Sequence, residues 1–407
     1  MNITKVAEGV TRLTANLENI LFEGFWEIPN GVSLNSYVIK GEKTAIIDGV
    51  LAFSDLSKAY LTALGKLDVS LDTVDYIIIN HMEPDHSGWI NTLKSINKDA
   101  KIICGQKSAV LLNSFCSITK NVEIIKDGDT LDLGAGRVLT FKEIPNVHWP
   151  DTIATFDTLS GTLFSCDAFG SYGKVTNKGY DNLLLEKELE FYEHEAIRYY
   201  SNIMAAFSPA VEKAIEKCSD LPINIIAPGH GIVWRENPKR IIDDYKRYVS
   251  YQKGPCKNHI TILIGSMYGM TKQGVDHAIE FLKDEDVTIH LHNVSEESWG
   301  TILASVWKST GIIVAMPTYE YKMYPPMASL LEEISKKKVQ NRKAFRIGSY
   351  GWSGGAQKEL NEIMTKYNTG WEFIEPVEYM GCPTNEDLKA IKKGVKQLVK
   401  KVKDAVK

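Results

Sequence analysis

The stretch 81-HMEPDHSGWI-90 brings two histidines and two carboxylates into six consecutive positions, at His81, Glu83, Asp85 and His86. It follows 74-VDYIIIN-80, an apolar run that is typical of a buried strand. Buried charged groups are costly unless they are paired or bind a metal. These side chains at the end of a core strand must therefore either pair with one another or bind a metal.

Three more candidate ligands stand at the ends of apolar strands further along the chain. His148 lies in 143-EIPNVHWP-150, Asp167 in 162-TLFSCDA-168, and His230 ends 223-INIIAPGH-230. The order is H-x-E-x-D-H, then 61 residues, His, 18 residues, Asp, 62 residues and His. The first cluster alone has a simpler interpretation, a patch of surface salt bridges. Seven such residues at strand ends favour a metal site, because ligands scattered in sequence converge in some folds.

The chain changes its pattern between residues 250 and 258. Before this point, short apolar runs alternate with turn residues, and two sheets covered by helices would bury so many strands. After it, five strand candidates each precede a helix, which is typical of a doubly wound parallel sheet. We therefore predict an α/β protein with domains at 1–252 and 258–407, joined by 251-YQKGPCKN-258.

The composition argues against several classes of protein. A net charge of −4 indicates no basic surface for nucleic acid or membranes. No apolar run approaches the roughly 20 residues of a membrane span, and the first 20 residues lack the features of a signal peptide, so we expect a cytoplasmic protein. The six cysteines form no C-x-x-C pair, which argues against a zinc ribbon, an iron–sulfur cluster or an attached rubredoxin-type module.

Three loops of the second domain fall where a doubly wound sheet binds its ligand. They are Ser266, Met267, Tyr268, Gly269, Met270 and Thr271 after the first strand, Pro317, Thr318, Tyr319 and Glu320 after the third, and Ser349, Tyr350, Gly351, Trp352, Ser353 and Gly354 after the fourth. Hydroxyls and a glycine before a helix suit a phosphate, although a capped helix start is the simpler interpretation of the first loop alone. Together the loops resemble those that hold FMN in flavodoxins, with Tyr319, Tyr350 and Trp352 as candidates to stack on its ring. Tyr268 departs from the common threonine of that pattern, and Glu320 from the common asparagine.

The spacing of the seven ligands resembles the metallo-β-lactamase fold, an αββα sandwich whose hydrolases carry H-x-H-x-D-H. Here Glu83 replaces the second histidine, and a mixed imidazole and carboxylate set suits iron better than zinc. With a flavodoxin-like domain behind it, the chain resembles the flavodiiron proteins over essentially its whole length. The resemblance implies two non-heme irons per chain. His81, Glu83 and His148 would hold one, Asp85, His86 and His230 the other, and Asp167 would bridge them.

This resemblance implies an oxidoreductase that passes electrons through FMN to O2, giving water, or to NO, giving nitrous oxide. It also implies a head-to-tail homodimer, with a dimer of dimers as a second form that the resemblance allows. The stretches 25-FWEIPNGVSLNSYVI-39, 146-NVHWPDTIATF-156, 317-PTYEYKMYPPM-327 and 349-SYGWSGGAQ-357 most resemble the methanogen members that oxidise reduced coenzyme F-420. We therefore expect O2 reduction with this donor, in the service of oxygen removal in an anaerobe.

Three other functions remain open at this point. The first is an NO or O2 reductase that is fed by rubredoxin. The second is a dinuclear zinc hydrolase, against which Glu83 and the flavin domain both argue. The third is a flavodoxin-like electron carrier with a structural metal domain.

Two aromatic residues fall in segments that line the diiron pocket in relatives. They are Trp26, in 23-EGFWEIPNG-31, and Tyr199, in 196-AIRYYSNI-203. Each would shape the gas cavity or supply a proton. Ordinary aromatic packing in the core explains them equally well.

Overall fold

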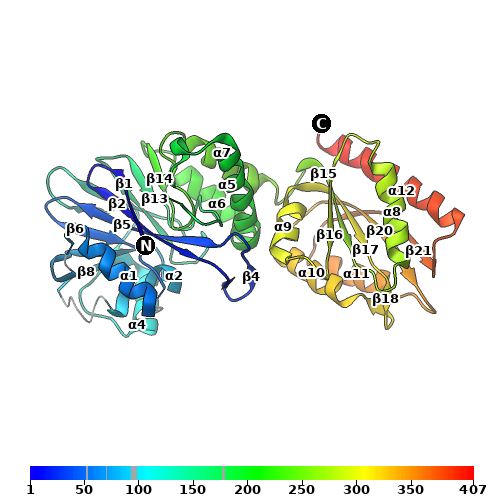
Figure 1. Ribbon diagram of the computed structural model, residues 1–407, viewed down its shortest axis with the longest axis horizontal. Helices are drawn as coiled ribbons and strands as arrows, with labels where there is room; N and C mark the ends of the chain where they lie inside the picture. The colour runs from blue at the N-terminus through cyan, green and yellow to red at the C-terminus, as the bar shows by residue number, and fades with distance from the viewer. Residues whose placement is uncertain (52–53, 70, 93–98, 177–178) are drawn as a thin grey trace. The chain divides into compact units, whose positions relative to one another are not determined.

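The computed structural model describes the chain from residue 1 to 407 except residues 52–53, 70, 93–98 and 177–178 (Figure 1). It contains two compact units, Met1–Lys246 and Arg247–Lys407. The division falls inside helix α7 (Pro238–Ser250), before the junction at 251–258. The predicted domain limits themselves stay a prediction.

Two sheets form the first unit. The larger has the strand order β1 (Asn2–Ala7), β2 (Val10–Leu17), β5 (Val32–Lys40), β6 (Thr44–Ile47), β7 (Tyr76–Ile79), β8 (Lys101–Gly105) and β9 (Val122–Ile125). The smaller has the order β10 (Thr130–Asp132), β11 (Val138–Glu143), β12 (Ile153–Asp157), β13 (Thr162–Phe164) and β14 (Ile225–Ala227). A short hairpin pairs β3 (Leu21–Phe22) with β4 (Trp26–Glu27).

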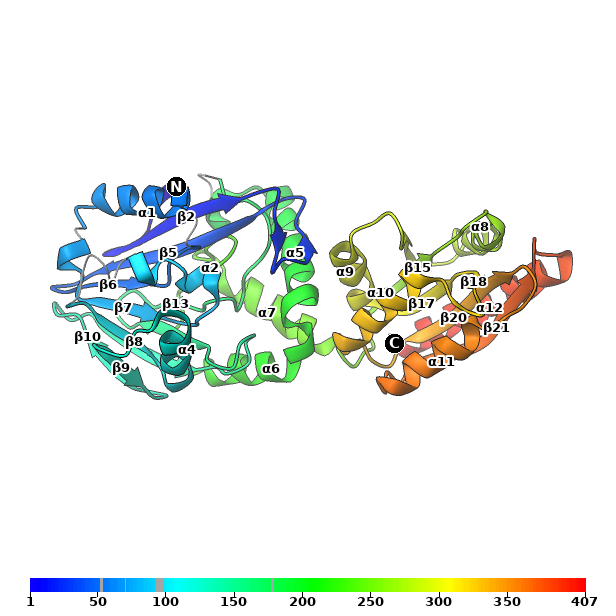
Figure 2. The ribbon, with the colours of Figure 1, turned by 90° about the horizontal axis from the view of Figure 1, so that it is seen from below.

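Helices cover both sheets from outside (Figures 1 and 2). They are α1 (Ser54–Gly65), α2 (Pro84–Ser87), α4 (Gln106–Cys116), α5 (Glu186–Tyr199), α6 (Ser208–Lys217) and α7. Ile77 and Ile79 of β7 pack with α1 and α4, whereas Ile78 faces the second sheet with Phe141 and Phe164. Both faces of β7 are therefore buried, which explains its unbroken apolar run. The predicted αββα sandwich of metallo-β-lactamase type is confirmed.

The strand ends determine where the candidate ligands lie. β13 and β14 are parallel, with Phe164 beside Ala227, and Asp167 and His230 each follow three residues after these positions. His81 comes two residues after the end of β7. Since the carboxyl ends of parallel strands meet at one edge of a sheet, residues far apart in sequence arrive at the same edge.

The second unit is a five-stranded parallel sheet. Its strand order is β16 (Thr288–Asn293), β15 (Lys257–Ile264), β17 (Ser309–Ala315), β20 (Lys343–Tyr350) and β21 (Glu372–Met380). Helices α8 (Met270–Leu282) and α12 (Asn385–Ala405) cover one face, and α9 (Trp299–Lys308), α10 (Pro325–Lys336) and α11 (Ala356–Lys366) lie on the other (Figure 1). The order 2-1-3-4-5 confirms the predicted flavodoxin-like sheet.

One element of this unit was not predicted. Strands β18 (Thr318–Tyr319) and β19 (Lys322–Met323) form a small hairpin directly after the third strand of the parallel sheet. Across the described residues, none of the helices has the combination of length and apolar character that a membrane span needs.

Candidate metal centre and cofactor pocket

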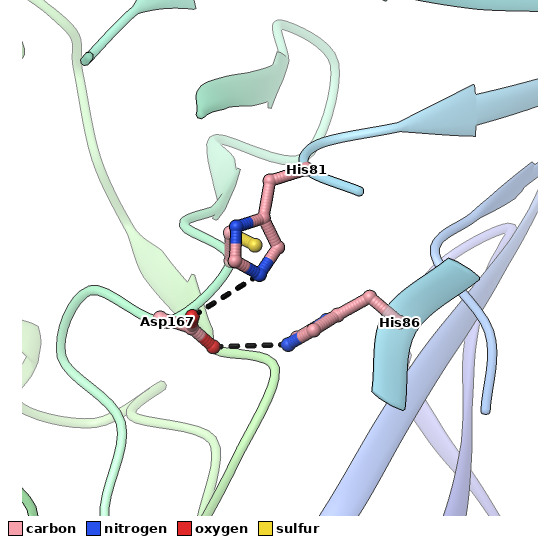
Figure 3. A group of neighbouring side chains, drawn as sticks. His81, His86 and Asp167 are labelled. Carbon is pink, nitrogen blue, oxygen red and sulfur yellow. Dashed lines mark hydrogen bonds and ion pairs between the residues drawn. The ribbon is translucent and has the colours of Figure 1, made fainter. Parts of the chain in front are cut away.

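The seven predicted ligands converge in the first unit. Asp167 lies at the centre, and its carboxylate faces His81, from the end of β7, and His86, from α2 (Figure 3). Histidine and carboxylate atoms gather here in overlapping groups, of which two are His81, Glu83, His148 and Asp167, and Asp85, His86 and His230. The third group adds Cys166 to His81, His86 and Asp167.

The two oxygens of Asp167 serve different groups. Oδ2 lies 3.3 Å from His81 Nε2 and 3.2 Å from His148 Nε2, and Glu83 Oε2 lies 3.0 Å from His148 Nε2. These four side chains present two nitrogens and two oxygens to one point.

A matching group surrounds the other oxygen. Asp167 Oδ1 lies 3.0 Å from His86 Nε2 and 3.1 Å from His230 Nε2. Asp85 completes the group, because its Oδ2 lies 3.3 Å from His230 Nε2. The carboxylate of Asp167 therefore joins two equivalent sets of donors.

Burial and mutual proximity perturb the protonation of these groups. Burial lowers the pKa of His81 to about 3 and raises that of Glu83 to about 7. Burial disfavours the charged forms of His86 and His148. The carboxylates that face these histidines outweigh this effect and raise the pKa values to about 9 for His86 and about 10 for His148. Clusters of strongly shifted pKa values are typical of functional sites.

The second unit holds a pocket at the carboxyl edge of its sheet. Its cavity volume is about 430 Å³, within the usual range for a cofactor site. Of the predicted loop residues, the walls contain Ser266, Met267, Tyr268, Met270, Thr271, Pro317, Thr318, Tyr319, Glu320, Ser349, Tyr350, Gly351, Trp352 and Ser353. All three predicted loops thus meet at one cavity.

Two predicted loop residues are absent from the pocket wall, and two unpredicted ones are present. Gly269 instead caps α8, with a φ of 88°, and its N–H donates to Ser266 Oγ. Gly354 lies against the Glu378 carboxylate. Tyr321 and Gly381 line the pocket. Tyr321 could have been found, because it alternates with Tyr319 in the same loop.

Comparisons with known proteins agree over the whole chain. A family model described as "ODP family beta lactamase" matches residues 32–231, which contain all seven candidate ligands. The anaerobic nitric oxide reductase flavorubredoxin of Vibrio vulnificus is 34% identical over 92% of this chain and 74% of its own length. The corresponding protein of Aliivibrio fischeri is 34% identical over 89% of this chain and 72% of its own length.

Solved structures give the same result. The rubredoxin oxygen:oxidoreductase of Desulfovibrio gigas is 26% identical, with a TM-score of 0.92 and 100% coverage of both chains. A variant of the flavo di-iron protein of Thermotoga maritima is 29% identical, with a TM-score of 0.88 and 98% coverage of both chains. The chain belongs to the flavodiiron protein family.

Membership confirms the expected cofactors, because flavodiiron proteins carry FMN and a non-heme diiron centre. It also makes the protein an oxidoreductase of the flavodiiron type, in place of the hydrolase and electron-carrier alternatives.

The metal cluster fits a diiron centre on its own chemistry. All seven side chains are buried, and several polar atoms among them lack a hydrogen-bond partner. These atoms are His81 Nδ1 and Nε2, both Asp85 oxygens, Asp167 Oδ2 and His230 Nε2. Buried polar atoms are normally satisfied, so unsatisfied donors and acceptors that face one another suit bound cations. The mixture of four imidazoles and three carboxylates suits iron.

A second layer of residues orients the candidate ligands, and sequence reasoning missed it. His230 Nδ1 lies 2.8 Å from the Ser33 carbonyl oxygen, so Nδ1 donates there and Nε2 is left for the metal. Asp48 Oδ2 lies 3.8 Å from His86 Nδ1, and the Asn80 N–H donates to Asp48 Oδ1. Burial raises the pKa of Asp48 to about 6. Ser33 and Asp48 lie far from the ligands in sequence and show no motif.

Aromatic side chains surround His230. The Phe22 and Tyr199 rings lie 5.5 and 5.7 Å from its imidazole. Tyr199 ends α5 just before a π-helical turn at Tyr200–Met204, and its buried hydroxyl lacks a hydrogen-bond partner. Trp26 is buried, pairs with Phe22 across the β3–β4 hairpin, and donates to Glu23. The roles predicted for Trp26 and Tyr199 stay predictions.

Proposed function

We propose that this flavodiiron protein reduces O2 to water by four electrons, with reduced coenzyme F-420 as the donor and FMN as the relay. The observation that carries the proposal is the carboxylate of Asp167, whose two oxygens face two separate donor sets. A bridged pair of metals is what such an arrangement suits, because each set supplies its own imidazoles and carboxylate.

The proposed assignment of ligands follows the distances. His81, Glu83 and His148 would hold one iron, and Asp85, His86 and His230 the other, with Asp167 between them. When bound, FMN converts a hydride into single electrons, and the two irons supply the site where a diatomic gas is reduced. The protein's contribution is to hold the ligands, to exclude bulk water from a buried site, and to keep the flavin loops at one edge of the second sheet.

The donor is proposed on the form of the flavin pocket. A deazaflavin gives up a hydride, so its ring must lie against FMN. Tyr321 and Trp352 at the pocket are 61% and 68% exposed, which leaves flat aromatic surface available to another ring. The sequence likeness to methanogen members around 317–327 and 349–357 points the same way.

A second candidate function is reduction of NO or O2 with electrons from rubredoxin. It is favoured by the relatives, among which are a nitric oxide reductase flavorubredoxin and a rubredoxin oxygen:oxidoreductase. The 407 residues contain no C-x-x-C pair, so they do not themselves include the ligand spacing of a rubredoxin centre.

We also propose a head-to-tail homodimer. The metal cluster lies in the unit Met1–Lys246 and the flavin pocket in the unit Arg247–Lys407. Electrons must therefore pass between units. In a head-to-tail dimer the flavin of one protomer would serve the metals of its partner.

The test is a comparison of four reactions of the purified protein. O2 and NO are each supplied with reduced deazaflavin and with reduced rubredoxin, and consumption of gas is followed with electrodes. We expect the fastest turnover with deazaflavin and O2. Faster turnover of NO with rubredoxin would establish the second candidate instead, and flavin reduction without gas consumption would contradict both.

A further inference from the structure

The hairpin beside the flavin pocket turns through two unusual residues. Between β18 and β19, Glu320 and Tyr321 form a two-residue loop with φ values of +47° and +65°. Hairpin turns with two positive φ values strongly favour Asn-Gly or Asp-Gly, because a side chain clashes with the backbone in this conformation. A bulky residue at positive φ is an outlier that calls for a reason.

The surrounding structure holds this turn in place. Gly355, just before α11, has a φ of +150°, and a Cβ built there would lie 2.1 Å from the Tyr321 carbonyl oxygen. The Met323 N–H donates to Glu359 Oε2 of α11 at 2.6 Å. Strained backbone persists where neighbouring contacts over-determine it, and such positions cluster at ligand sites.

The turn brings one aromatic ring against another at the mouth of the pocket. Tyr321 and Trp352 meet edge to face, with ring centroids 4.6 Å apart and an interplanar angle of 76°. They come from different loops, after β17 and after β20, and both line the pocket. A core contact does not explain them, since more than half of each side chain remains exposed.

Other exposed apolar side chains surround the same opening. Met267, Tyr268 and Tyr319 line the pocket and are 40%, 83% and 40% exposed. Exposed apolar surface gathered around one cavity marks a binding site rather than chance. Its chemistry suits a flat aromatic ring, and aromatic rings gain stability from edge-to-face and offset contacts.

We propose that the chain retains the strained Glu320–Tyr321 turn because this turn holds Tyr321 against Trp352. The two aromatic side chains then form a surface on which the ring of reduced deazaflavin binds. The inference rests on the proposed function and names the residue that selects this donor. Tyr321 acts by orienting the donor over the flavin. It is not required to hold FMN itself.

The experiment compares Tyr321→Gly with Lys338→Gly. Lys338 is a matched control, because it is exposed, has a φ of +60°, and follows α10 at the edge of the sheet opposite the pocket. Glycine is unstrained at both positions. Tyr321→Asn provides a second variant, since asparagine also tolerates this conformation.

Both glycine variants should melt no lower than the wild type. Only the changes at Tyr321 should weaken binding of oxidised deazaflavin to the FMN-loaded protein, and raise the KM for reduced deazaflavin, by about tenfold. The dissociation constant of FMN should stay within about twofold of the wild-type value, because Tyr321 lies at the mouth of the pocket with most of its side chain exposed.

Three results would overturn the inference. A fall in melting temperature at Tyr321 beyond that of Lys338→Gly would show that the tyrosine is kept for packing. Parallel loss of FMN affinity would show that it holds the flavin. Unchanged affinity for deazaflavin would show that the donor binds elsewhere. If wild-type FMN is not reduced by deazaflavin at all, the proposed function fails first and the inference falls with it.

Discussion

Asp167 is the residue whose carboxylate joins the two donor groups of the cluster. One of its oxygens lies within 3.3 Å of His81 and His148, and the other within 3.1 Å of His86 and His230. Its pKa is held well below the ordinary value because the facing histidines outweigh the effect of burial. An ionised carboxylate at this position serves both groups at once.

Asp167→Ala should therefore remove both irons, not one. Loss of the bridge leaves each group with three ligands, and we expect metal affinity to fall by at least about 100-fold. Mutating a residue that only hydrogen-bonds to a metal ligand already lowers metal affinity by about 10- to 100-fold. Iron and flavin are measured on the same desalted sample. FMN content should be unchanged because its pocket lies in the other unit. Retention of one firmly bound iron would contradict the bridging role.

Glu83 distinguishes this cluster from its hydrolytic relatives. Glu83→His restores the pattern H-x-H-x-D-H, replaces an anionic oxygen by a neutral nitrogen, and should favour zinc over iron. Gas reduction should fall by at least about tenfold, as changes around a metal commonly do. Stopped-flow absorbance should show flavin reduction by the donor at the wild-type rate. Full oxygen consumption by an iron-loaded variant would show that the Glu83 carboxylate is not needed for gas reduction.

At the scale of single elements, a pair of histidines lies between the edge strand β16 and its neighbour β15. His290 Nε2 lies 3.1 Å from His259 Nδ1 of β15, so one ring donates to the other and at least one must be neutral. Burial, helped by Lys257 and Lys308, lowers the pKa of both histidines to about 4. The ordinary value is 6.5.

This pair predicts how stability depends on pH. Both folded pKa values lie below the unfolded value, so the unfolded chain takes up protons first as the pH falls. The contribution of this histidine pair to the free energy of unfolding is fully present above pH 6.5 and is lost between pH 6.5 and about 4. Urea unfolding of the second unit, followed by flavin fluorescence, should show a midpoint that falls in this window. His290→Gln should flatten the fall, whereas His277→Gln, outside the pair, should not. An equal slope in both variants would contradict the assignment.

Strand ends explain how much of the site was predictable. We could group His148, Asp167 and His230 with the motif at 81–86 because each follows an apolar run that predicts a strand. The β18–β19 hairpin was missed because Glu320-Tyr321 lacks the glycine or asparagine that usually marks such a turn. Asp48 and Phe22 were missed because only the folded chain brings them to the ligands.

At the scale of the whole molecule, the candidate metal cluster and the candidate flavin pocket lie in different units, and the proposed dimer can be tested by mixing variants. Asp167→Ala should lack the metals, and Ser266→Asp should lack FMN, because a carboxylate in the first flavin loop repels a phosphate. Each homodimer should be inactive. Co-expressed and separated by tags, the mixed dimer should recover activity, because one protomer supplies flavin and its partner supplies metals. Failure to recover would favour transfer within one chain.

In the proposed reaction, O2 is reduced by four electrons at the metals, and the flavin only passes electrons on. The direct measurement is the ratio of reduced deazaflavin oxidised to O2 consumed, together with an assay for hydrogen peroxide. Deazaflavin gives two electrons per molecule, so we expect two donor molecules to be oxidised for each O2 and no peroxide to form. One donor molecule for each O2, with peroxide formed in equal amount, would mean that the flavin reacts with O2 directly and would contradict reduction at the metals.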